Sequence, residues 1–216
     1  MQTEQSGTPL FTIVMPTYLG KYNTAGKERE MKLSRAVQSV INQSYQNWEL
    51  IIIADGCQKS VDIIQENRFL NDERISMYLI DKCKIWSGTP RNIGIKNAKG
   101  KYIIYLDADD IYDQEYLIDL SKEVADRDWY IVDDIVYRKT KAGWETIIRP
   151  VNVNVHGQCG TSNIIHKTSL NCYWNVNDNY SHDYRFLNIL KAVSEDYQKI
   201  NIAGYVVCHI PNIYDL

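Results

Sequence analysis

Two kinds of hydrophobic pattern alternate along the first half of the chain. Short apolar runs predict buried strands, and the segments between them carry apolar residues at the spacing of a helix. Residues 19–30 have no apolar period, so we expect a loop there. The predicted strands cover residues 11–15, 48–54, 75–80 and 102–106, and the predicted helices cover residues 33–41, 61–70 and 88–99.

Proline and glycine mark two of these boundaries. Pro16 follows the first strand, and we expect the strand to stop there because proline has no N–H group for the sheet. Gly100 follows the helix at 88–99, and we expect it to form that helix's C-terminal stop.

The alternation predicts an α/β fold, with a mostly parallel sheet and helices on both faces. In such a sheet, ligands bind beyond the carboxyl ends of the strands. Pro16, Asp55 and Asp107 each come directly after a predicted strand. The sequence therefore predicts one crevice to which three strand ends contribute.

The second half of the chain has a less regular pattern. Residues 151–163 predict a long loop. We expect the polar residues 1–8 to be a disordered tail and residues 9–216 to form a single domain, because no internal repeat or low-complexity tract divides them. The predicted helices cover residues 113–125 and 184–193, and the predicted strands cover 129–137, its hairpin partner 144–149, and 200–210.

Composition and charge narrow the classes of function. The chain has 216 residues, 44% of them hydrophobic and 24% charged, which excludes a disordered or collagen-like protein. With 24 basic and 27 acidic residues the net charge is −3, so no global field attracts nucleic acid, and we expect no nucleic-acid partner.

Cysteine usage and hydropathy indicate the compartment. The five cysteines form no CxxC pair, which favours free thiols in a reducing compartment. No apolar stretch approaches the roughly 18 residues of a membrane span, and the first ten residues lack a signal-peptide pattern. We therefore expect a cytoplasmic protein with no transmembrane segment, able to rest peripherally on a membrane through a partner.

An acidic turn follows the strand at 102–106. Asp107 and Asp109 stand one residue apart on this turn, so both carboxylates can point towards one cation. Mn²⁺ and Mg²⁺ prefer such hard oxygen ligands and leave positions open for diphosphate oxygens. The alternative is an acidic turn that caps the next helix.

Four strings of residues agree in order and spacing with one known family. They are VMPTY at 14–18, SVINQSYQNWELIIIADG at 39–56, TPRNIGIKNAKGKYIIYLDADD at 89–110 and SHDY at 181–184. These strings resemble family 2 glycosyltransferases, which are inverting enzymes with a GT-A fold. The resemblance implies a Rossmann-like sheet, with a nucleotide-sugar-binding half at 9–110 and a smaller acceptor-binding half at 111–216.

The resemblance also implies roles for single residues. Asp183 matches the catalytic base, although a helix N-cap is the alternative for it. Asp107 and Asp109 match the metal ligands, and His209 is a candidate third ligand, unless it is simply a buried strand histidine. Arg91 and Asn92 match residues that face the nucleotide. The alternative for Arg91 is a surface ion pair, and the alternative for Asn92 is a helix cap. The implied contacts of the nucleotide-sugar are Pro16, Thr17, Tyr18, Asp55, Arg91, Asn92, Asp107 and Ala108.

The sequence departs from the family pattern in three places. Ala54 stands where the family commonly has an acid, and the loop at 19–30 is longer and more charged. His182 stands where the family usually has glutamate. We expect its side chain to start about 100° around the helix from Asp183 and not to replace that base.

Aromatic residues and the remaining histidines offer weaker signals. Trp86 and Trp174 are candidate platforms for a sugar ring, with a place in the core as the alternative. His156 and His166 have no spacing that indicates a ligand, so we expect them to be structural.

The function implied by the resemblance is transfer of a sugar from a nucleotide-diphospho-sugar to a hydroxyl group. We favour a UDP-linked donor, a glycan, lipid-linked or protein acceptor, and a role in polysaccharide or glycoconjugate synthesis; an oligomer is compatible with this. A nucleotidyltransferase is the second candidate, although PTYLGKYN after the first strand is not the Gly-rich basic loop of that class. A non-catalytic protein that binds sugar nucleotides is the third, favoured if His182 marks decay of the motif.

Overall fold

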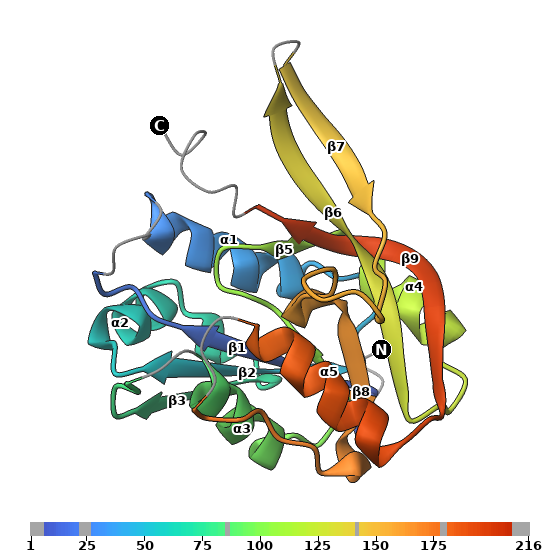
Figure 1. Cartoon of the computed structure of the whole chain (residues 1–216). Helices are drawn as coiled ribbons and strands as arrows, with labels where there is room; N and C mark the ends of the chain where they lie inside the picture. Colours follow the sequence, from blue (N-terminus) through green and yellow to red (C-terminus); the bar gives the residue numbers. More distant parts are fainter. Residues whose placement is uncertain (1–6, 22–26, 85–86, 141–142, 178–180, 209–216) are drawn as a thin grey trace.

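The computed structural model describes residues 7–21, 27–84, 87–140, 143–177 and 181–208. Within these residues nine strands form one sheet in the order β3-β2-β1-β4-β8-β6-β9-β5, and β7 pairs with β6 outside this path (Figure 1). The strands are β1 (Phe11–Thr17), β2 (Trp48–Asp55), β3 (Ile75–Ile80), β4 (Tyr102–Tyr105), β5 (Ile111–Tyr112), β6 (Trp129–Thr140), β7 (Gly143–Arg149), β8 (Ile164–Lys167) and β9 (Tyr197–Val207). The helices are α1 (Arg29–Ile41), α2 (Gln58–Glu66), α3 (Gly88–Asn97), α4 (Tyr116–Glu123) and α5 (His182–Val193), with short 3₁₀ turns η1 (Phe69–Asn71), η2 (Thr161–Asn163) and η3 (Thr168–Leu170).

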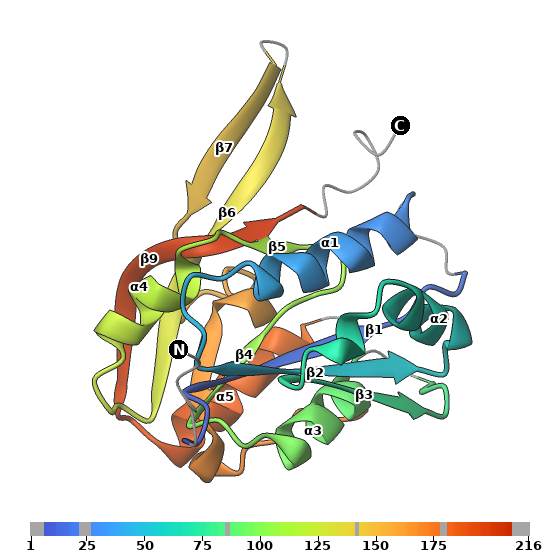
Figure 2. The same ribbon diagram turned by 180° about the vertical axis from the view of Figure 1, so that it is seen from behind.

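Helices cover both faces of the sheet, because successive residues of a buried strand point to opposite sides. Ile13 and Met15 of β1 belong to the cluster that includes Leu33 of α1. Val14 belongs to the opposite cluster, which includes Ile95 of α3. In both views α1 lies above β1, β2 and β3, and α3 lies below them (Figure 1, Figure 2). The predicted α/β fold with helices on both faces is therefore confirmed.

The sheet is parallel in its first half and mixed in its second. The strands β3, β2, β1 and β4 all run parallel. Beyond them β8 pairs antiparallel with both β4 and β6, and β6 pairs parallel with β9. The predicted hairpin is present as β6 and β7, and its outer part projects from the body (Figure 1). No helix in the described ranges is long and apolar enough to cross a membrane.

The prediction that β1 stops at Pro16 is wrong, because β1 continues to Thr17 and Pro16 still pairs with Ile53 of β2. The reason lies in which neighbour the proline nitrogen faces. Val14 accepts a hydrogen bond from Leu106 after β4, so the nitrogen of Pro16, two residues on, faces that same side. The missing N–H therefore ends the pairing with β4 and leaves the pairing with β2 intact.

Local patterns also misplaced several helix ends. The loop predicted at 19–30 is wrong at its end, since α1 begins at Arg29, whose guanidinium donates hydrogen bonds to the carbonyls of Tyr18 and Gly20. The second helix covers 58–66 rather than 61–70, because Arg68 adopts a positive φ and interrupts it. The hydrophobic spacing of the sequence could predict neither the hydrogen bonds of Arg29 nor the backbone angle of Arg68.

Gly100 is not the stop of α3, which ends at Asn97. Its amide instead donates to the hydroxyl of Thr12 at 2.8 Å, and a Cβ atom here would lie 2.6 Å from the backbone nitrogen of Thr12. The glycine is thus required by the close approach of the chain to β1.

The second half holds elements that the pattern did not predict. The strands β5 and β8 and the turn η2 were missed, the last inside the loop predicted at 151–163. The helix α4 is shorter than the predicted 113–125, α5 begins two residues before the predicted Tyr184, and β9 begins at Tyr197 rather than at Ile200. A four-residue strand ending in His166 and Lys167 has too short an apolar run to be recognised.

Candidate active site

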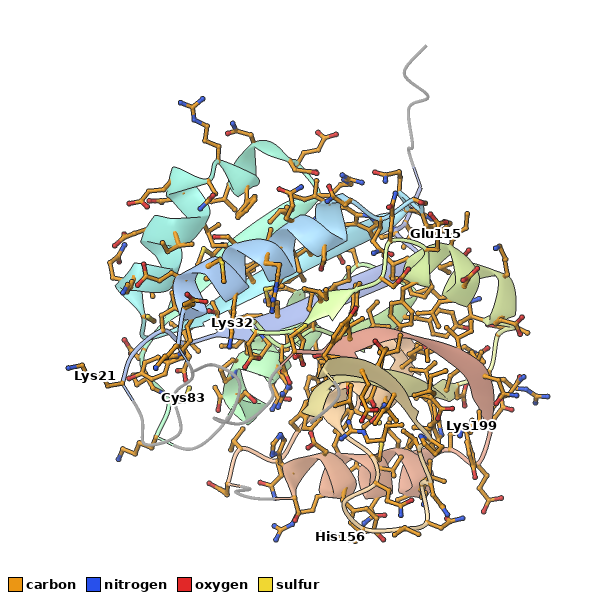
Figure 3. All side chains as sticks on the ribbon, turned by 90° about the horizontal axis from the view of Figure 1, so that it is seen from above. Lys21, Lys32, Cys83, Glu115, His156 and Lys199 are labelled. Atoms are coloured by element: carbon orange, nitrogen blue, oxygen red, sulfur yellow. The ribbon has the colours of Figure 1, made fainter. Side chains whose placement is uncertain are left out.

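A cavity of about 840 Å³ lies at the carboxyl ends of the parallel strands. Residues from three strand ends form its wall, as the sequence predicted for the crevice. These residues are Pro16, Thr17 and Tyr18 after β1, Asp55 of β2, and Asp107, Ala108 and Asp109 after β4. Figure 3 labels Cys83, which lies on the rim of this cavity.

Asp55 is held at the cavity wall by the segment that follows β3. Its carboxylate accepts a hydrogen bond from the Lys82 ammonium at 2.6 Å and from the Cys83 amide at 2.7 Å. The same ammonium lies 4.4 Å from the centroid of the Tyr18 ring, a cation–π contact. The sequence reasoning missed Lys82, although a residue just past a strand parallel to β2 could have been expected beside Asp55.

The acidic turn after β4 separates its three aspartates. Asp107 and Asp109 line the cavity, whereas Asp110 points into the protein and is 4% exposed. Asp110 accepts hydrogen bonds from the Tyr205 hydroxyl and the Cys208 amide, both at 2.7 Å. Burial raises the pKa of Asp110 to about 7, and the charges of Asp109 and Asp107 act in the same direction. Asp110 thus anchors the turn to β9, and the other two carboxylates remain at the cavity.

The chemistry of Asp107 and Asp109, which are both half-buried at the cavity, fits a divalent cation. Burial raises the pKa of Asp107, the charge of Arg91 lowers it, and the charges of Asp109 and Asp183 raise it again, so a bound cation would relieve repulsion. In the described ranges no three acidic, histidine or cysteine side chains stand close enough to hold a metal. His209 lies outside those ranges. The carboxylate oxygens of Asp107 and Asp109 suit Mg²⁺ or Mn²⁺, because these ions prefer oxygen ligands and keep further positions for water and substrate oxygens.

Arg91 is a buried residue that does not belong to the wall of the larger cavity. Its side chain is 4% exposed, and its Nη2 atom is 3.1 Å from Oδ1 of Asp107. The guanidinium carbon lies 4.7 Å from the centroid of the Trp174 ring. The Nε and Nη1 atoms are buried with no hydrogen-bond partner in the described ranges. The predicted ion-pair alternative for Arg91 is present, and a nucleotide contact by Arg91 stays a prediction.

Asp183 lies on the wall of a second cavity, of about 270 Å³. Its Oδ1 atom accepts a hydrogen bond from the Thr161 hydroxyl and lies 3.1 Å from Nε2 of His182. Burial alone raises the pKa of Asp183, but the hydrogen bond from His182, the charge of Arg91 and the Thr161 hydroxyl together hold that pKa below its ordinary value. The carboxylate is therefore ionised at neutral pH.

The side chain of His182 contacts Asp183 even though the two side chains are expected to start about 100° apart around the helix. The imidazole reaches the neighbouring carboxylate in the first turn of α5. Its ring lies 5.7 Å from that of Trp174. The sequence reasoning also missed Thr161. It treated His156, which Figure 3 labels, as structural. His156 and Tyr184 both line the second cavity, and their ring centroids are 4.9 Å apart.

Asn92 and Trp174 hold the base of the site together. Both amide atoms of Asn92 bond to the backbone of Trp174 at 2.8 Å, and Asn92 is not on the cavity wall. Trp174 is 2% exposed and stacks on Phe186 at 4.1 Å, so its reading as a sugar platform is wrong. Trp86 lies outside the described residues.

The family model for glycosyl transferase family 2 matches residues 12–187. The chain belongs to this family. It is 39% identical over 103 residues to an uncharacterised glycosyltransferase of Haemophilus influenzae, an alignment that covers 47% of this chain and 37% of the relative. It is 33% identical over 107 residues to the Escherichia coli UDP-Glc:alpha-D-GlcNAc-diphosphoundecaprenol beta-1,3-glucosyltransferase WfgD, over 48% of this chain and 36% of the enzyme. The chain thus spans little more than a third of the length of these relatives.

Solved structures share the fold over most of the chain. S. aureus TarS, residues 1–349, superposes with a TM-score of 0.70 at 16% identity, covering 91% of this chain and 59% of TarS. The mannosyltransferase PcManGT of Pyrobaculum calidifontis, in complex with GDP-Man and Mn²⁺, superposes with a TM-score of 0.65 at 10% identity, over 94% and 58%. The expected GT-A fold is confirmed.

We predict that Arg91→Met lowers the free energy of unfolding by about 2–4 kcal/mol, because it leaves the Asp107 and Asp183 carboxylates without their buried cation. Urea denaturation at pH 7 measures this. Arg127→Met is the matched control, because the Arg127–Asp196 pair is exposed and solvent screens it, so we expect a much smaller loss. Equal losses in the two variants would contradict the prediction.

Proposed function

We propose that this protein transfers a sugar from a nucleotide-diphospho-sugar to a hydroxyl acceptor with inversion at the anomeric carbon. The observation that carries the proposal is the arrangement of two adjacent cavities. The larger one has carboxylates from β2 and β4 on its wall, and the smaller one has Asp183 on its wall. Asp183 raises the pKa of Asp107, so the two sets of acids are electrostatically coupled.

The larger cavity is the proposed site of the donor. The Tyr18 ring and the Asp55 carboxylate would hold the nucleotide base, with Lys82 between them as a further contact. Asp107 and Asp109 would hold Mn²⁺ or Mg²⁺, which when bound supplies positive charge to the diphosphate that leaves. WfgD is named for a UDP-linked donor, which supports our preference for UDP.

The smaller cavity is the proposed site of the acceptor. In a single displacement the acceptor hydroxyl attacks the anomeric carbon while Asp183 takes its proton, and the bond from that carbon to the diphosphate oxygen breaks on the opposite face. A carboxylate with a lowered pKa is a weak base but is always ionised at neutral pH, and the hydroxyl need lose its proton only as the new bond forms.

A lipid-linked sugar is the acceptor class that we favour. WfgD is named for an acceptor linked to diphosphoundecaprenol, and this relative supports the choice. Such an acceptor would bring the enzyme to the cytoplasmic surface of a membrane as a peripheral protein. Free glycans and proteins are the other acceptor classes to compare with it.

The test is a panel of nucleotide-sugars supplied with Mn²⁺ and candidate acceptors, with both nucleoside diphosphate and glycosylated product measured. We predict transfer by the wild type and a loss of about 10²–10⁴-fold in Asp183→Asn, which keeps size but removes the basic charge. Asp196→Asn, a partly exposed acid that pairs with Arg127 and lines neither cavity, is the control. Binding without turnover of any donor would favour the non-catalytic alternative, and pyrophosphate release from a nucleoside triphosphate and a sugar phosphate would favour a nucleotidyltransferase.

We predict that Asp55→Asn weakens UDP binding by about 1–3 kcal/mol, the usual effect of removing a buried hydrogen-bonding carboxylate. The substitution also removes the ion pair that holds Lys82 over Tyr18. Calorimetric titration with UDP measures the change, with Asp62→Asn on the exposed face of α2 as control. Unchanged affinity would reduce Asp55 to a turn residue.

We predict that Asp109→Ala abolishes the thermodynamic coupling between Mn²⁺ and UDP, because one of the two cavity carboxylates is lost. UDP affinity measured with and without Mn²⁺ should differ for the wild type and be equal for the variant. Asp119→Ala, a partly exposed acid of α4 that lies on neither cavity wall, should behave as the wild type. Coupling that survives in Asp109→Ala would argue against this residue as a ligand.

A further inference from the structure

Two hydrogen-bond donors converge on one oxygen of Asp183. The Thr161 hydroxyl donates to Oδ1, and Nε2 of His182 lies 3.1 Å from the same atom. Within the described ranges, Oδ2 accepts no hydrogen bond from the protein. The two oxygens of this carboxylate are therefore in different environments.

Thr161 is supported by a rigid turn. It opens η2 and is 5% exposed, and the next two residues bond to the buried carboxylate of Asp134, Ser162 at 3.2 Å and Asn163 at 3.1 Å. Arg149 of β7 forms an ion pair with that same carboxylate. The turn that carries Thr161 is thus anchored to β6 through Asp134.

His182 is supported from the other side. Its side chain is 15% exposed and its ring lies against that of Trp174, which is itself stacked on Phe186. The two donors to Asp183 thus come from different elements, each with its own packed support. A carboxylate on a single bond is otherwise free to rotate between equivalent orientations.

We propose that Thr161 and His182 are positioning residues that anchor Oδ1 of Asp183 and leave Oδ2 as the atom that takes the proton of the acceptor hydroxyl. The inference rests on the proposed function and deepens it, because it assigns the role of base to one oxygen atom, and the orientation of that carboxylate to the neighbouring His182 and to Thr161 of η2. Holding a catalytic group to within a fraction of an ångström is the general requirement for efficient transfer.

The surrounding charges give the proposal a second readout. Arg91 of α3, Asp107 after β4, and Cys159 before η2 interact with Asp183 electrostatically, and Arg149, His156 and Tyr184 face it across the second cavity. Burial raises the pKa of Asp183, whereas the two donors and Arg91 lower it. Removing a donor therefore raises that pKa, and the acid limb of the kcat–pH profile should move to higher pH.

The decisive experiment compares Thr161→Val with Thr161→Ser in the transfer assay. Thr161 is not on the wall of the second cavity, so its substitution does not remove an acceptor contact. We expect Thr161→Val to lower kcat by about 10–100-fold, the order of loss for a misplaced catalytic group, and to shift the acid limb upward. Donor KM, UDP affinity and melting temperature should stay near wild type, and Thr161→Ser should restore kcat to within about threefold. Thr146→Val, at an exposed position of β7, is the control.

The same logic applies to His182. His182→Gln keeps an Nε2 donor at a similar reach and should retain most of kcat, whereas His182→Ala should lose most of kcat and shift the acid limb to higher pH.

Equal kcat and equal pH profiles in Thr161→Val and Thr161→Ser would overturn the proposal. A loss of kcat in Thr161→Val that is matched by lost UDP affinity and a lower melting temperature would also overturn it. A wild type that transfers no sugar would overturn the proposed function instead, so the two failures are distinguishable.

Discussion

A buried positive charge allows carboxylates from distant parts of the chain to lie close together. The guanidinium of Arg91 is 3.1 Å from Asp107, and its charge lowers the pKa of Asp183 as well. Acids removed from water without a counter-charge would bind protons instead of remaining ionised. Arg91 lies in the first turn of α3. The position at which α3 begins therefore determines where this positive charge lies relative to Asp107 and Asp183.

Trp174 connects α3 to α5. Asn92, next to Arg91, holds the backbone of Trp174 through two hydrogen bonds, and the indole stacks on Phe186 of α5. The Trp174 N–H donates to the hydroxyl of Tyr105, which is also bonded to His166. Buried contacts of Trp174 therefore connect α3, which carries Arg91, to α5, which carries Asp183.

The sequence allowed prediction of those features that topology alone determines. Once the first half was interpreted as strands alternating with helices, the parallel sheet had to bring Pro16, Asp55 and Asp107 to one edge, and the structure places them there. Features that depend on tertiary neighbours could not be predicted in the same way. The reach of His182 towards Asp183 and the burial of Trp174 both depend on elements that approach from elsewhere in the chain. The strand β8 was missed for a similar reason, since its four residues are stabilised by pairing with β4 and β6 rather than by their own pattern.

The strand order explains why the larger cavity lies beside Pro16. From β1 the chain moves outward to β2 and β3, and then returns to β4 on the other side of β1. The connections that leave β1 and β4 consequently run in opposite directions, which makes the boundary between these strands a topological switch point. The absent amide hydrogen of Pro16 ends their pairing at that boundary, so the gap in the sheet arises from backbone chemistry. The position of the cavity is then determined by the topology of the sheet, and the residues at the strand ends determine which groups line it.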